Sequence, residues 1–106
     1  MQPFTERAIE IIKSIPPGRV MTYGQIARLA GNPFGARQVS WLLHSMSRVH
    51  KLPWHRIINA KGEISYTGSE QREMLEMEGV IFTKNGKVDL HTYQWLPELT
   101  RTLEEE

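Results

Sequence analysis

The chain has 106 residues, of which 40% are hydrophobic and 24% charged, a composition typical of one small globular domain and not of a disordered chain. No apolar run approaches the roughly 20 residues of a membrane span, and the opening MQPFTERAIE lacks the basic and then apolar pattern of a signal peptide, so we expect neither secretion nor a membrane partner. The absence of cysteine excludes disulfides, thiolate metal sites and cysteine nucleophiles.

The formal net charge is only +1, but the charges are segregated along the chain. Residues 11–62 contain no Asp or Glu, whereas Lys, Arg and His recur throughout them. The acids lie near the ends, most densely from Glu63 onward. This segregation predicts a surface that faces a polyanion. The alternative is a chance distribution in which every charged face is solvated.

The first two predicted helices each have one apolar face. A helix from about Thr5 to Ile15 is predicted by Phe4, Ala8, Ile11, Ile12 and Ile15, and Pro16 and Pro17 end it. After a short extended piece, Thr22 and Gln25 have the spacing of a capping box that opens the second helix. Its apolar side continues to Ala30, and Gly31 is suited to end it.

The third predicted helix runs from about Ala36 to Met46. Its apolar side chains are Val39, Leu42, Leu43 and Met46, at i, i+3, i+4 and i+7. Its other face carries small polar, basic and aromatic side chains: Arg37, Ser40, Trp41, His44, Ser45 and Arg48. Two helices joined by a short turn that contains glycine, the second with a basic face, indicate a helix-turn-helix.

The second half of the chain predicts short hairpins around one further helix. Residues 57–58 and 63–65 flank a turn at 59–62, and residues 80–82 and 88–90 flank Asn85-Gly86, a type I′ hairpin signal. Between them, a helix capped by Ser69 extends to Glu78 and closes at Gly79. We therefore expect one α+β domain over residues 1–106, a small winged helix-turn-helix with short β-hairpins and a disordered acidic tail at 104–106.

The run Pro53-Trp54-His55-Arg56 carries the most distinctive side chains. An aromatic ring and an arginine beside a basic helix can stack on and hold an extruded nucleobase. Alternatively, Trp54 belongs to the core, His55 is a buried histidine with satisfied hydrogen bonds and Arg56 pairs with an acid nearer the C-terminus. Spacing alone leaves both interpretations open. No metal or cofactor site is indicated, because the histidines lack the spacing of metal ligands.

Several motifs together resemble the DNA-binding domain of O6-alkylguanine-DNA alkyltransferases, over roughly Phe4 to Val80. They are residues 17–27 (PGRVMTYGQIA), 31–33 (GNP), 36–39 (ARQV) and 53–57 (PWHRI). The enzymes have Pro-Cys-His-Arg, whose cysteine accepts the alkyl group, where this chain has Trp54. Their N-terminal α/β domain also has no counterpart in this sequence. Both differences resemble the alkyltransferase-like proteins, which bind alkylated guanine without repairing it.

The resemblance implies a protein that is not an enzyme and uses no cofactor. Its partners would be double-stranded DNA containing O6-alkylguanine and the nucleotide-excision repair proteins for which it marks the lesion. It would act as a monomer, at the nucleoid in a bacterial cytoplasm or in a eukaryotic nucleus. The preferred alkyl group does not follow from the resemblance.

The resemblance also implies roles for individual residues. Tyr23 presses on the phosphate backbone and rotates the target nucleotide, and Arg37 fills the gap that the flipped base leaves. The lesion pocket is expected to comprise Trp54, His55, Arg56 and Tyr66. The DNA-binding helix would present Ala36, Arg37, Ser40, Trp41, His44 and Ser45, whose small members permit close approach in the minor groove.

Three further expectations concern the supporting structure. His55 and Glu78 match the enzymes' relay and are expected to persist as hydrogen-bond partners with no cysteine to activate. Met46 stands where the enzymes have an asparagine that braces the active-site turn. Residues 88–97, with Tyr93 and Trp95, either help to wall the pocket or form a satellite of the core.

Two other classes of function are compatible with parts of the pattern. A sequence-specific helix-turn-helix regulator would need base-reading side chains and usually a dimer, but the exposed helix face is poor in Asn and Gln. A glycosylase or histidine-based hydrolase would need paired acids, which the basic half of the chain lacks.

Overall fold

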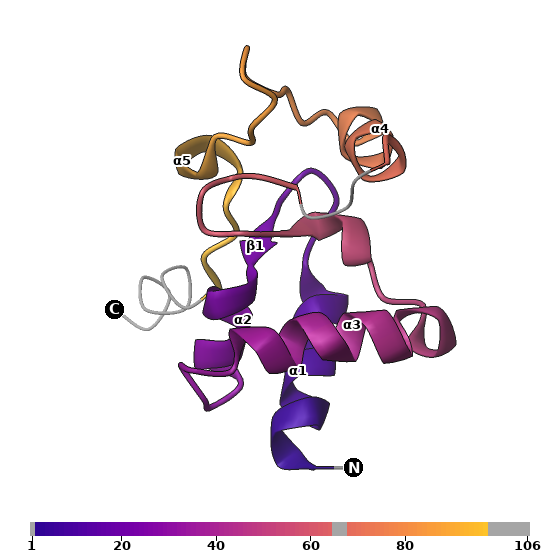
Figure 1. The fold of residues 1–106 in the computed structure, drawn as a ribbon, viewed down its shortest axis with the longest axis vertical. Coiled ribbons are helices and arrows are strands. Elements are labelled where there is room, and N and C mark those ends of the chain that lie inside the picture. Colours follow the sequence, from indigo (N-terminus) through magenta and orange to yellow (C-terminus); the bar gives the residue numbers. More distant parts are fainter. Residues whose placement is uncertain (1, 65–67, 98–106) are drawn as a thin grey trace.

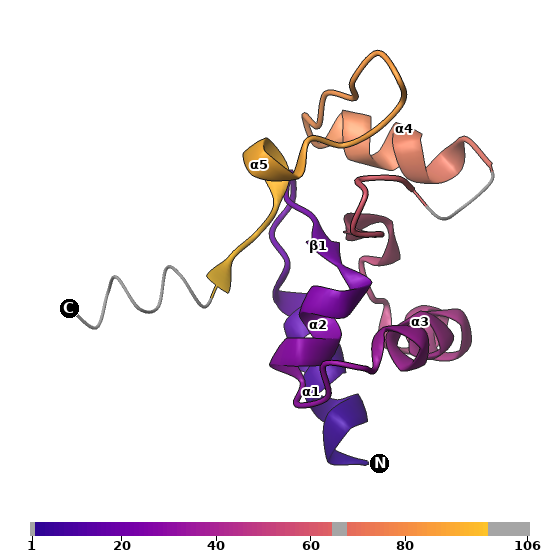
Figure 2. The same cartoon turned by 60° about the vertical axis from the view of Figure 1, so that its left-hand side comes forward.

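The computed structural model describes residues 2–64 and 68–97 and has an α+β fold (Figure 1). Helices α1, α2 and α3 lie together at one end of the molecule, and α4 and α5 lie at the other (Figures 1 and 2). The elements in chain order are α1 (Pro3–Ser14), β1 (Met21–Thr22), α2 (Tyr23–Leu29), α3 (Ala36–His50), the 3-10 helix η1 (Trp54–Arg56), β2 (Ile57–Ile58), α4 (Glu70–Met77) and α5 (Leu90–Tyr93). None of the helices in the described part of the chain is long and apolar enough to cross a membrane.

The first three helices enclose the main core, as their apolar periodicity predicts. Ala8 and Ile12 of α1, Ile26 of α2 and Val39 of α3 are fully buried in it. A second, smaller core lies toward α4 and comprises Val20, Ile58, Leu75, Val80 and Val88. The chain between the two cores carries η1 and the short sheet, and it therefore positions Trp54.

The predicted capping box at the start of α2 is confirmed. The Thr22 hydroxyl oxygen accepts a hydrogen bond from the Gln25 amide at 3.1 Å, and the Gln25 side chain accepts one from the Thr22 amide at 3.4 Å. The Gln25 side chain also donates to the Trp95 carbonyl at 2.6 Å. The start of α2 is thereby tied to the C-terminal part of the described chain.

Helix α3 is longer than predicted and ends at His50, not at Met46. The apolar stripe stops near Met46, but residues 47–50 contain no proline or glycine to end the helix. Lys51, with a φ of 53°, supplies the left-handed residue that closes it. The Ser47 carbonyl accepts from the Leu52 amide at 2.9 Å, and the Leu52 side chain then returns to the main core.

The hairpin predicted over residues 57–65 forms only as a turn at 59–62, in which the Asn59 amide donates to the Glu63 carbonyl and the Gly62 amide to the Asn59 carbonyl, both at 3.1 Å. No antiparallel strand pair flanks this turn among the described residues. Strand β2 pairs in parallel with β1, so that Met21 lies opposite Ile57 and Thr22 opposite Ile58. The side-chain oxygen of Asn59 accepts from the amides of Lys61 and Glu63, both at 2.9 Å. This side chain reinforces the turn beside its two backbone hydrogen bonds.

The predicted hairpin around Asn85-Gly86 forms, but with a different turn. It is reduced to one antiparallel bridge between Phe82 and Val88. A type I′ turn needs a positive φ at both central residues, whereas only Gly86, at 76°, has one. Thr83 and Lys87 instead close a three-residue loop through a 2.8 Å backbone hydrogen bond. Residues 88–90 do not extend into a strand, because α5 begins at Leu90.

The prediction that Ser69 caps α4 is also wrong. Ser69 has helical backbone angles, φ −83° and ψ −10°, and its side chain makes no capping hydrogen bond. A capping side chain normally requires an extended backbone at its own residue.

The segment that contains Tyr93 and Trp95 is part of the cores. The Val20 amide donates to the Tyr93 carbonyl at 3.0 Å, and the Trp95 amide donates to the Val20 carbonyl at 2.8 Å. Trp95 packs against the main core and Tyr93 against the smaller one. Of the two expectations for this segment, the satellite of the core is the one that the structure has.

One carboxylate, that of Glu78, joins three separate parts of the chain, and we call this arrangement the Glu78 clamp. It accepts a hydrogen bond from the Gly18 amide at 3.0 Å and lies 2.8 Å from His55 Nε2. Arg56 donates to it through Nε at 3.0 Å and Nη2 at 2.6 Å, and through Nη1 to the Ile15 carbonyl at 2.9 Å. The expected pairing of His55 with Glu78 is confirmed.

The clamp strongly favours the ionised form of Glu78. Burial by itself raises the pKa of this carboxyl, but the hydrogen bonds from Arg56, the Gly18 amide and His55 outweigh it. The pKa therefore falls from its ordinary 4.5 to about 2. Because folding favours the ionised form, the stabilisation is complete above about pH 5 and is lost as the pH falls toward 2.

Replacing Glu78 by Gln should lower the free energy of unfolding at neutral pH by on the order of 2–4 kcal/mol, because Arg56 then remains half-buried without a carboxylate. The wild-type protein should lose stability between about pH 5 and pH 2, and this part of the pH dependence should be absent from the variant. Urea denaturation monitored by tryptophan fluorescence at several pH values measures both effects.

Glu76→Gln is the matched control on the same helix. Glu76 pairs with Arg72 at 3.6 Å, and both side chains are largely exposed. Its loss should cost less than about 0.5 kcal/mol and leave the acid dependence unchanged. A Glu78→Gln protein with the wild-type slope in acid would show that the clamp is not its source.

Candidate nucleic-acid interface

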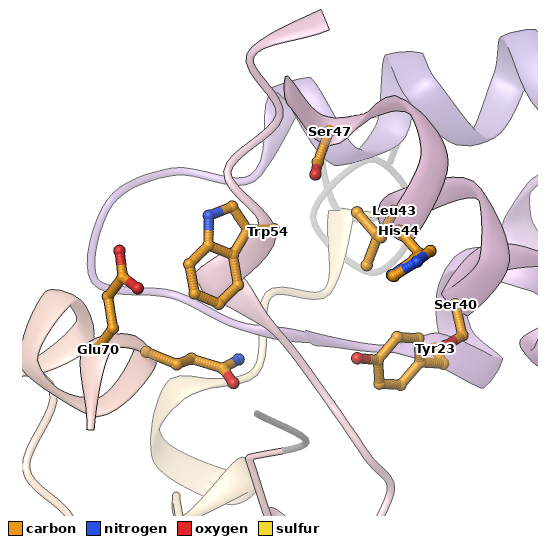
Figure 3. A pocket seen from close by; sticks show the side chains of 8 residues that line it. Tyr23, Ser40, Leu43, His44, Ser47, Trp54 and Glu70 are labelled. Atoms are coloured by element: carbon orange, nitrogen blue, oxygen red, sulfur yellow. The ribbon is translucent and has the colours of Figure 1, made fainter. Parts of the chain in front are cut away.

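A cavity of about 360 Å³ opens between α2, α3, η1 and α4. Figure 3 shows the Trp54 indole on one side of it and the side chains of Tyr23, Ser40 and His44 on the other. We call it the Trp54 cavity; its lining residues are Tyr23, Ser40, Leu43, His44, Ser47, Trp54, Glu70 and Gln71. The wall is thus mixed: aromatic and aliphatic surface is interrupted by hydroxyl, imidazole, amide and carboxylate groups.

The indole of Trp54 is held from behind by backbone and core contacts. The Trp54 amide donates to the Leu52 carbonyl at 2.8 Å, and the indole packs against the main core. The buried Gln71 side chain donates to the carbonyls of His55 at 3.2 Å and Ile57 at 3.0 Å. Helix α4 therefore fixes the position of η1 and, with it, the aromatic wall of the cavity.

Side chains on the outward side of α3 line two separate hollows. Ser40 and His44 line the Trp54 cavity. Trp41 and Ser45 line a second hollow of about 220 Å³ on the α1 side, and the Trp41 side chain is 70% exposed. The residues predicted for the DNA-binding helix are all exposed, apart from the half-buried Ala36.

Tyr23 and Arg37 occupy helix starts near this surface. Tyr23 is the first residue of α2 and lines the cavity. Arg37 lies in the first turn of α3, is exposed and is not part of the cavity lining. Both are on the acid-free part of the chain, residues 11–62, as an interface with phosphates requires.

The residues expected in the lesion pocket lie in different places. Trp54 lines the cavity, whereas His55 and Arg56 lie behind it in the Glu78 clamp. Tyr66 lies outside the described residues. The structure thus unites the two interpretations of this motif: the indole faces the cavity, and the next two side chains are structural.

The cavity offers an aromatic surface and polar groups to a bound molecule, but no thiol. The sequence has no cysteine, and residue 54 presents an indole where the enzymes have a thiol. His55 is 6% exposed, its Nε2 contacts Glu78, and its Nδ1 has no hydrogen-bond partner among the described residues. Within these residues no three His, Asp or Glu side chains are placed to hold a metal ion.

Sequence reasoning did not anticipate Glu70, Gln71 and Ser47 in the lining, and it assigned Leu43 only to the core. Glu70 and Gln71 come from α4, which only the folded chain brings opposite α3. Gln71 carried one weak signal, a polar side chain one turn before the buried Leu75 on an otherwise solvated helix. Nothing in its spacing indicates that it binds the carbonyls of η1.

Comparison with known proteins gives the family. Residues 3–80 match the family described as 6-O-methylguanine DNA methyltransferase, DNA binding domain. The DNA base-flipping protein of Escherichia coli (strain K12) is 44% identical over 95 residues, which cover 87% of this chain and 74% of the relative. Alkyltransferase-like protein 1 of Schizosaccharomyces pombe is 38% identical over 106 residues, which cover 92% and 98%.

Solved structures agree with the sequence relatives. The crystal structure of S. pombe Atl1 in complex with damaged DNA containing O6-carboxymethylguanine matches with a TM-score of 0.79 and 38% identity, over 92% of this chain and 98% of that one. Mycobacterium tuberculosis OGT in complex with DNA matches with a TM-score of 0.63 and 30% identity, over 74% and 50%. The chain thus corresponds to about half of that methyltransferase and to nearly all of Atl1.

The motifs of the sequence and the fold agree with the family of these relatives. The chain belongs to the family of the 6-O-methylguanine DNA methyltransferase DNA-binding domain and, within it, is an alkyltransferase-like protein with Trp54 at the position of the acceptor cysteine.

Proposed function

We propose that this protein binds double-stranded DNA containing O6-alkylguanine, rotates the damaged nucleotide out of the helix and holds its base in the Trp54 cavity without removing the alkyl group. The observation that carries the proposal is the position of the cavity. It opens beside the exposed, acid-free side of α3, and its wall presents an indole where the methyltransferases have a reactive thiol.

The DNA-binding part of the proposal uses α2 and α3 as a helix-turn-helix, with residues 80–88 in the place of a wing. Ser40 and Ser45 are small enough for α3 to approach a minor groove closely. The basic side chains of residues 11–62 supply the attraction to phosphate. The relatives named as a DNA base-flipping protein and as Atl1 in complex with damaged DNA support binding to DNA with base flipping.

The cavity suits one flipped purine. Its volume of about 360 Å³ is within the range of small-molecule sites. Trp54 offers a flat surface on which any base can stack, and base–aromatic stacking contributes about 1–3 kcal/mol. Tyr23 borders the same cavity at the start of α2, where it can press on the backbone of the rotating nucleotide.

Removal of the alkyl group would require a nucleophile that this chain lacks. His55 and Glu78 retain the geometry of the enzymes' relay, with 2.8 Å between Nε2 and the carboxylate. In this chain they hold η1 in place, and the adjacent side chain is an indole. A bound lesion therefore leaves the protein chemically unchanged, and the persistence of the complex recruits further repair.

The proposal extends to the steps after binding. A monomer that holds a flipped, unrepaired base marks the site for nucleotide-excision repair proteins. It would do so on chromosomal DNA, at the nucleoid in a bacterial cytoplasm or in a eukaryotic nucleus.

Matched duplexes that contain guanine or O6-methylguanine at one position test the proposal. We expect about tenfold tighter binding of the lesion duplex, which corresponds to about 1.4 kcal/mol, because a damaged and poorly paired base is easier to flip. Fluorescence anisotropy gives the affinities, and mass spectrometry of the recovered DNA should find the methyl group still on guanine.

Two outcomes would contradict the proposal: equal affinity for both duplexes, or loss of the methyl group. A third arm compares two undamaged sequences, because a preference above tenfold between them would favour a sequence-specific regulator. Affinity for every duplex should fall with rising salt as counterions are released.

Arg37→Ala should separate flipping from docking. Without the guanidinium to occupy the vacated stack, discrimination between lesion and normal duplex should shrink by about 1 kcal/mol, which is most of the expected tenfold preference, while much of the salt-dependent docking remains. Arg48→Ala, which removes an equal charge from the last turn of α3, should lower both affinities alike. Full discrimination by the Arg37→Ala protein would remove Arg37 from the flipping step.

The role of the Tyr23 ring is tested by two variants. Tyr23→Phe should be mild and Tyr23→Ala more damaging to lesion binding, if the bulk of the ring against the phosphate matters more than its hydroxyl. Titration of the lesion duplex with each variant measures this order. Equal losses in both variants would assign the effect to the hydroxyl instead.

Trp54→Cys restores the residue types of the enzymes' Pro-Cys-His-Arg motif, yet we expect little or no methyl transfer to the new thiol. Reaction needs the sulfur about 3–3.5 Å from the methyl carbon and in line with the bond that breaks, and an error of about 1 Å can cost on the order of a hundredfold. Met46, at the position of the bracing asparagine, packs against the main core and has no amide to offer. Lesion binding should also weaken, because the stacking surface is lost.

Single-turnover incubation with excess Trp54→Cys protein, followed by mass spectrometry of the protein, is the measurement. Trp54→Phe is the control, since it keeps an aromatic surface and should retain more lesion binding than the cysteine variant. Stoichiometric methylation of residue 54 within minutes would show an enzyme disarmed by one substitution and would overturn this account of the cavity.

A further inference from the structure

The Trp54 cavity has one feature that recognition of a flipped base does not require. Among the described side chains that line it, Glu70 carries the one carboxylate. Figure 3 shows Glu70 on the α4 side of the Trp54 indole, with His44 and Tyr23 across the cavity. An acid at this place contrasts with the acid-free segment that forms the other walls.

The carboxylates of α4 and its C-terminal end have different environments. Glu78 belongs to the clamp, and Glu76 pairs with Arg72 at 3.6 Å. Glu73 lies on the exposed part of the helix and does not line the cavity. Among the described residues, no hydrogen bond or ion pair engages the Glu70 carboxylate, although an acid in the first helical turn is itself favoured by the helix dipole. Its charge therefore acts on whatever occupies the cavity.

The dimensions of the cavity make that charge relevant to the adduct. A volume of about 360 Å³ corresponds to a space roughly 7–9 Å across, which is comparable to the Debye length of about 8 Å at physiological salt. Any charge on the alkyl group of a bound base is consequently within reach of Glu70.

We propose that Glu70 determines which O6-alkyl groups this protein accepts: it selects against adducts that carry a negative charge and favours neutral and cationic ones. This inference rests on the proposed function, because it assumes that the flipped base enters the Trp54 cavity. Glu70 is then a specificity residue, which sets the order of affinities among adducts. The DNA complex of S. pombe Atl1 contains O6-carboxymethylguanine, but binding of one adduct does not give such an order.

Three duplexes that differ only in the charge of one adduct test the inference. They contain O6-carboxymethylguanine (negative), O6-carbamoylmethylguanine (neutral and nearly the same shape) or O6-(2-aminoethyl)guanine (positive). The wild-type protein should bind the carbamoylmethyl duplex about three- to fivefold more tightly than the carboxymethyl duplex, the size expected for two charges in partly solvated surroundings. The aminoethyl duplex should bind at least as tightly as the neutral one.

Glu70→Gln keeps the length and shape of the side chain and removes its charge. In this variant the affinity for the carboxymethyl duplex should rise, that for the aminoethyl duplex should fall, and that for the carbamoylmethyl duplex should stay within about twofold. Opposite changes for opposite charges identify an electrostatic effect, which a loss of packing or of helix stability cannot produce. All affinities are measured at one pH and one ionic strength, so that only the charges of the adduct and of residue 70 differ between the arms.

Glu73→Gln is the matched control, because it removes the same charge from the same helix outside the cavity. It should change the affinities for all three duplexes by one common factor. The inference is overturned if Glu70→Gln preserves the wild-type ratios, or if Glu73→Gln alters them equally. The wild-type preference for O6-methylguanine over guanine is measured in parallel. If this preference is present but Glu70→Gln leaves the ratios of the three affinities unchanged, only the inference about Glu70 is overturned. If the preference is absent, the proposed function is overturned as well.

Discussion

The geometry of the candidate site depends on the Glu78 carboxylate. Four nitrogens from two segments converge on it: the Gly18 amide, His55 Nε2 and the two contacting nitrogens of Arg56. An ionised group in such surroundings is stable only when it is fully hydrogen-bonded, and these bonds hold its pKa near 2. Because His55 and Arg56 directly follow Trp54, the clamp fixes the chain on which the indole is presented.

The cavity is a consequence of how α3 and α4 are held apart. Helix α3 packs in the main core and α4 in the smaller core, and η1 lies between these two helices in the chain. Gln71 secures this connection by donating to two carbonyls of the η1 and β2 segment. Supports on both sides allow a binding surface to be pre-formed, which lowers the free-energy cost of binding.

The exchange of a thiol for an indole changes the function of an otherwise retained scaffold. The pairing of His55 with Glu78, which would serve a nucleophile in the methyltransferases, here has a structural use, and His55 Nδ1 is left without a described partner. A planar aromatic surface binds bases through their faces and does not depend on the identity of the alkyl group. In the proposed function, discrimination among adducts depends on the polar groups around the indole, among which Glu70 carries the carboxylate in the described lining.

The sequence by itself determined the helices of the main core, the capping box at Thr22 and the absence of a thiol, because periodicity, capping and composition are local properties. The motif at residues 53–57 also located the aromatic residue at the cavity. Only the tertiary structure decided that β2 pairs in parallel with β1, that Arg56 faces Glu78 and not the cavity, and that Glu70 and Gln71 complete the lining. These contacts join residues far apart in the chain, and their partners are selected by packing and by the cost of burying unpaired polar groups, which no local spacing records.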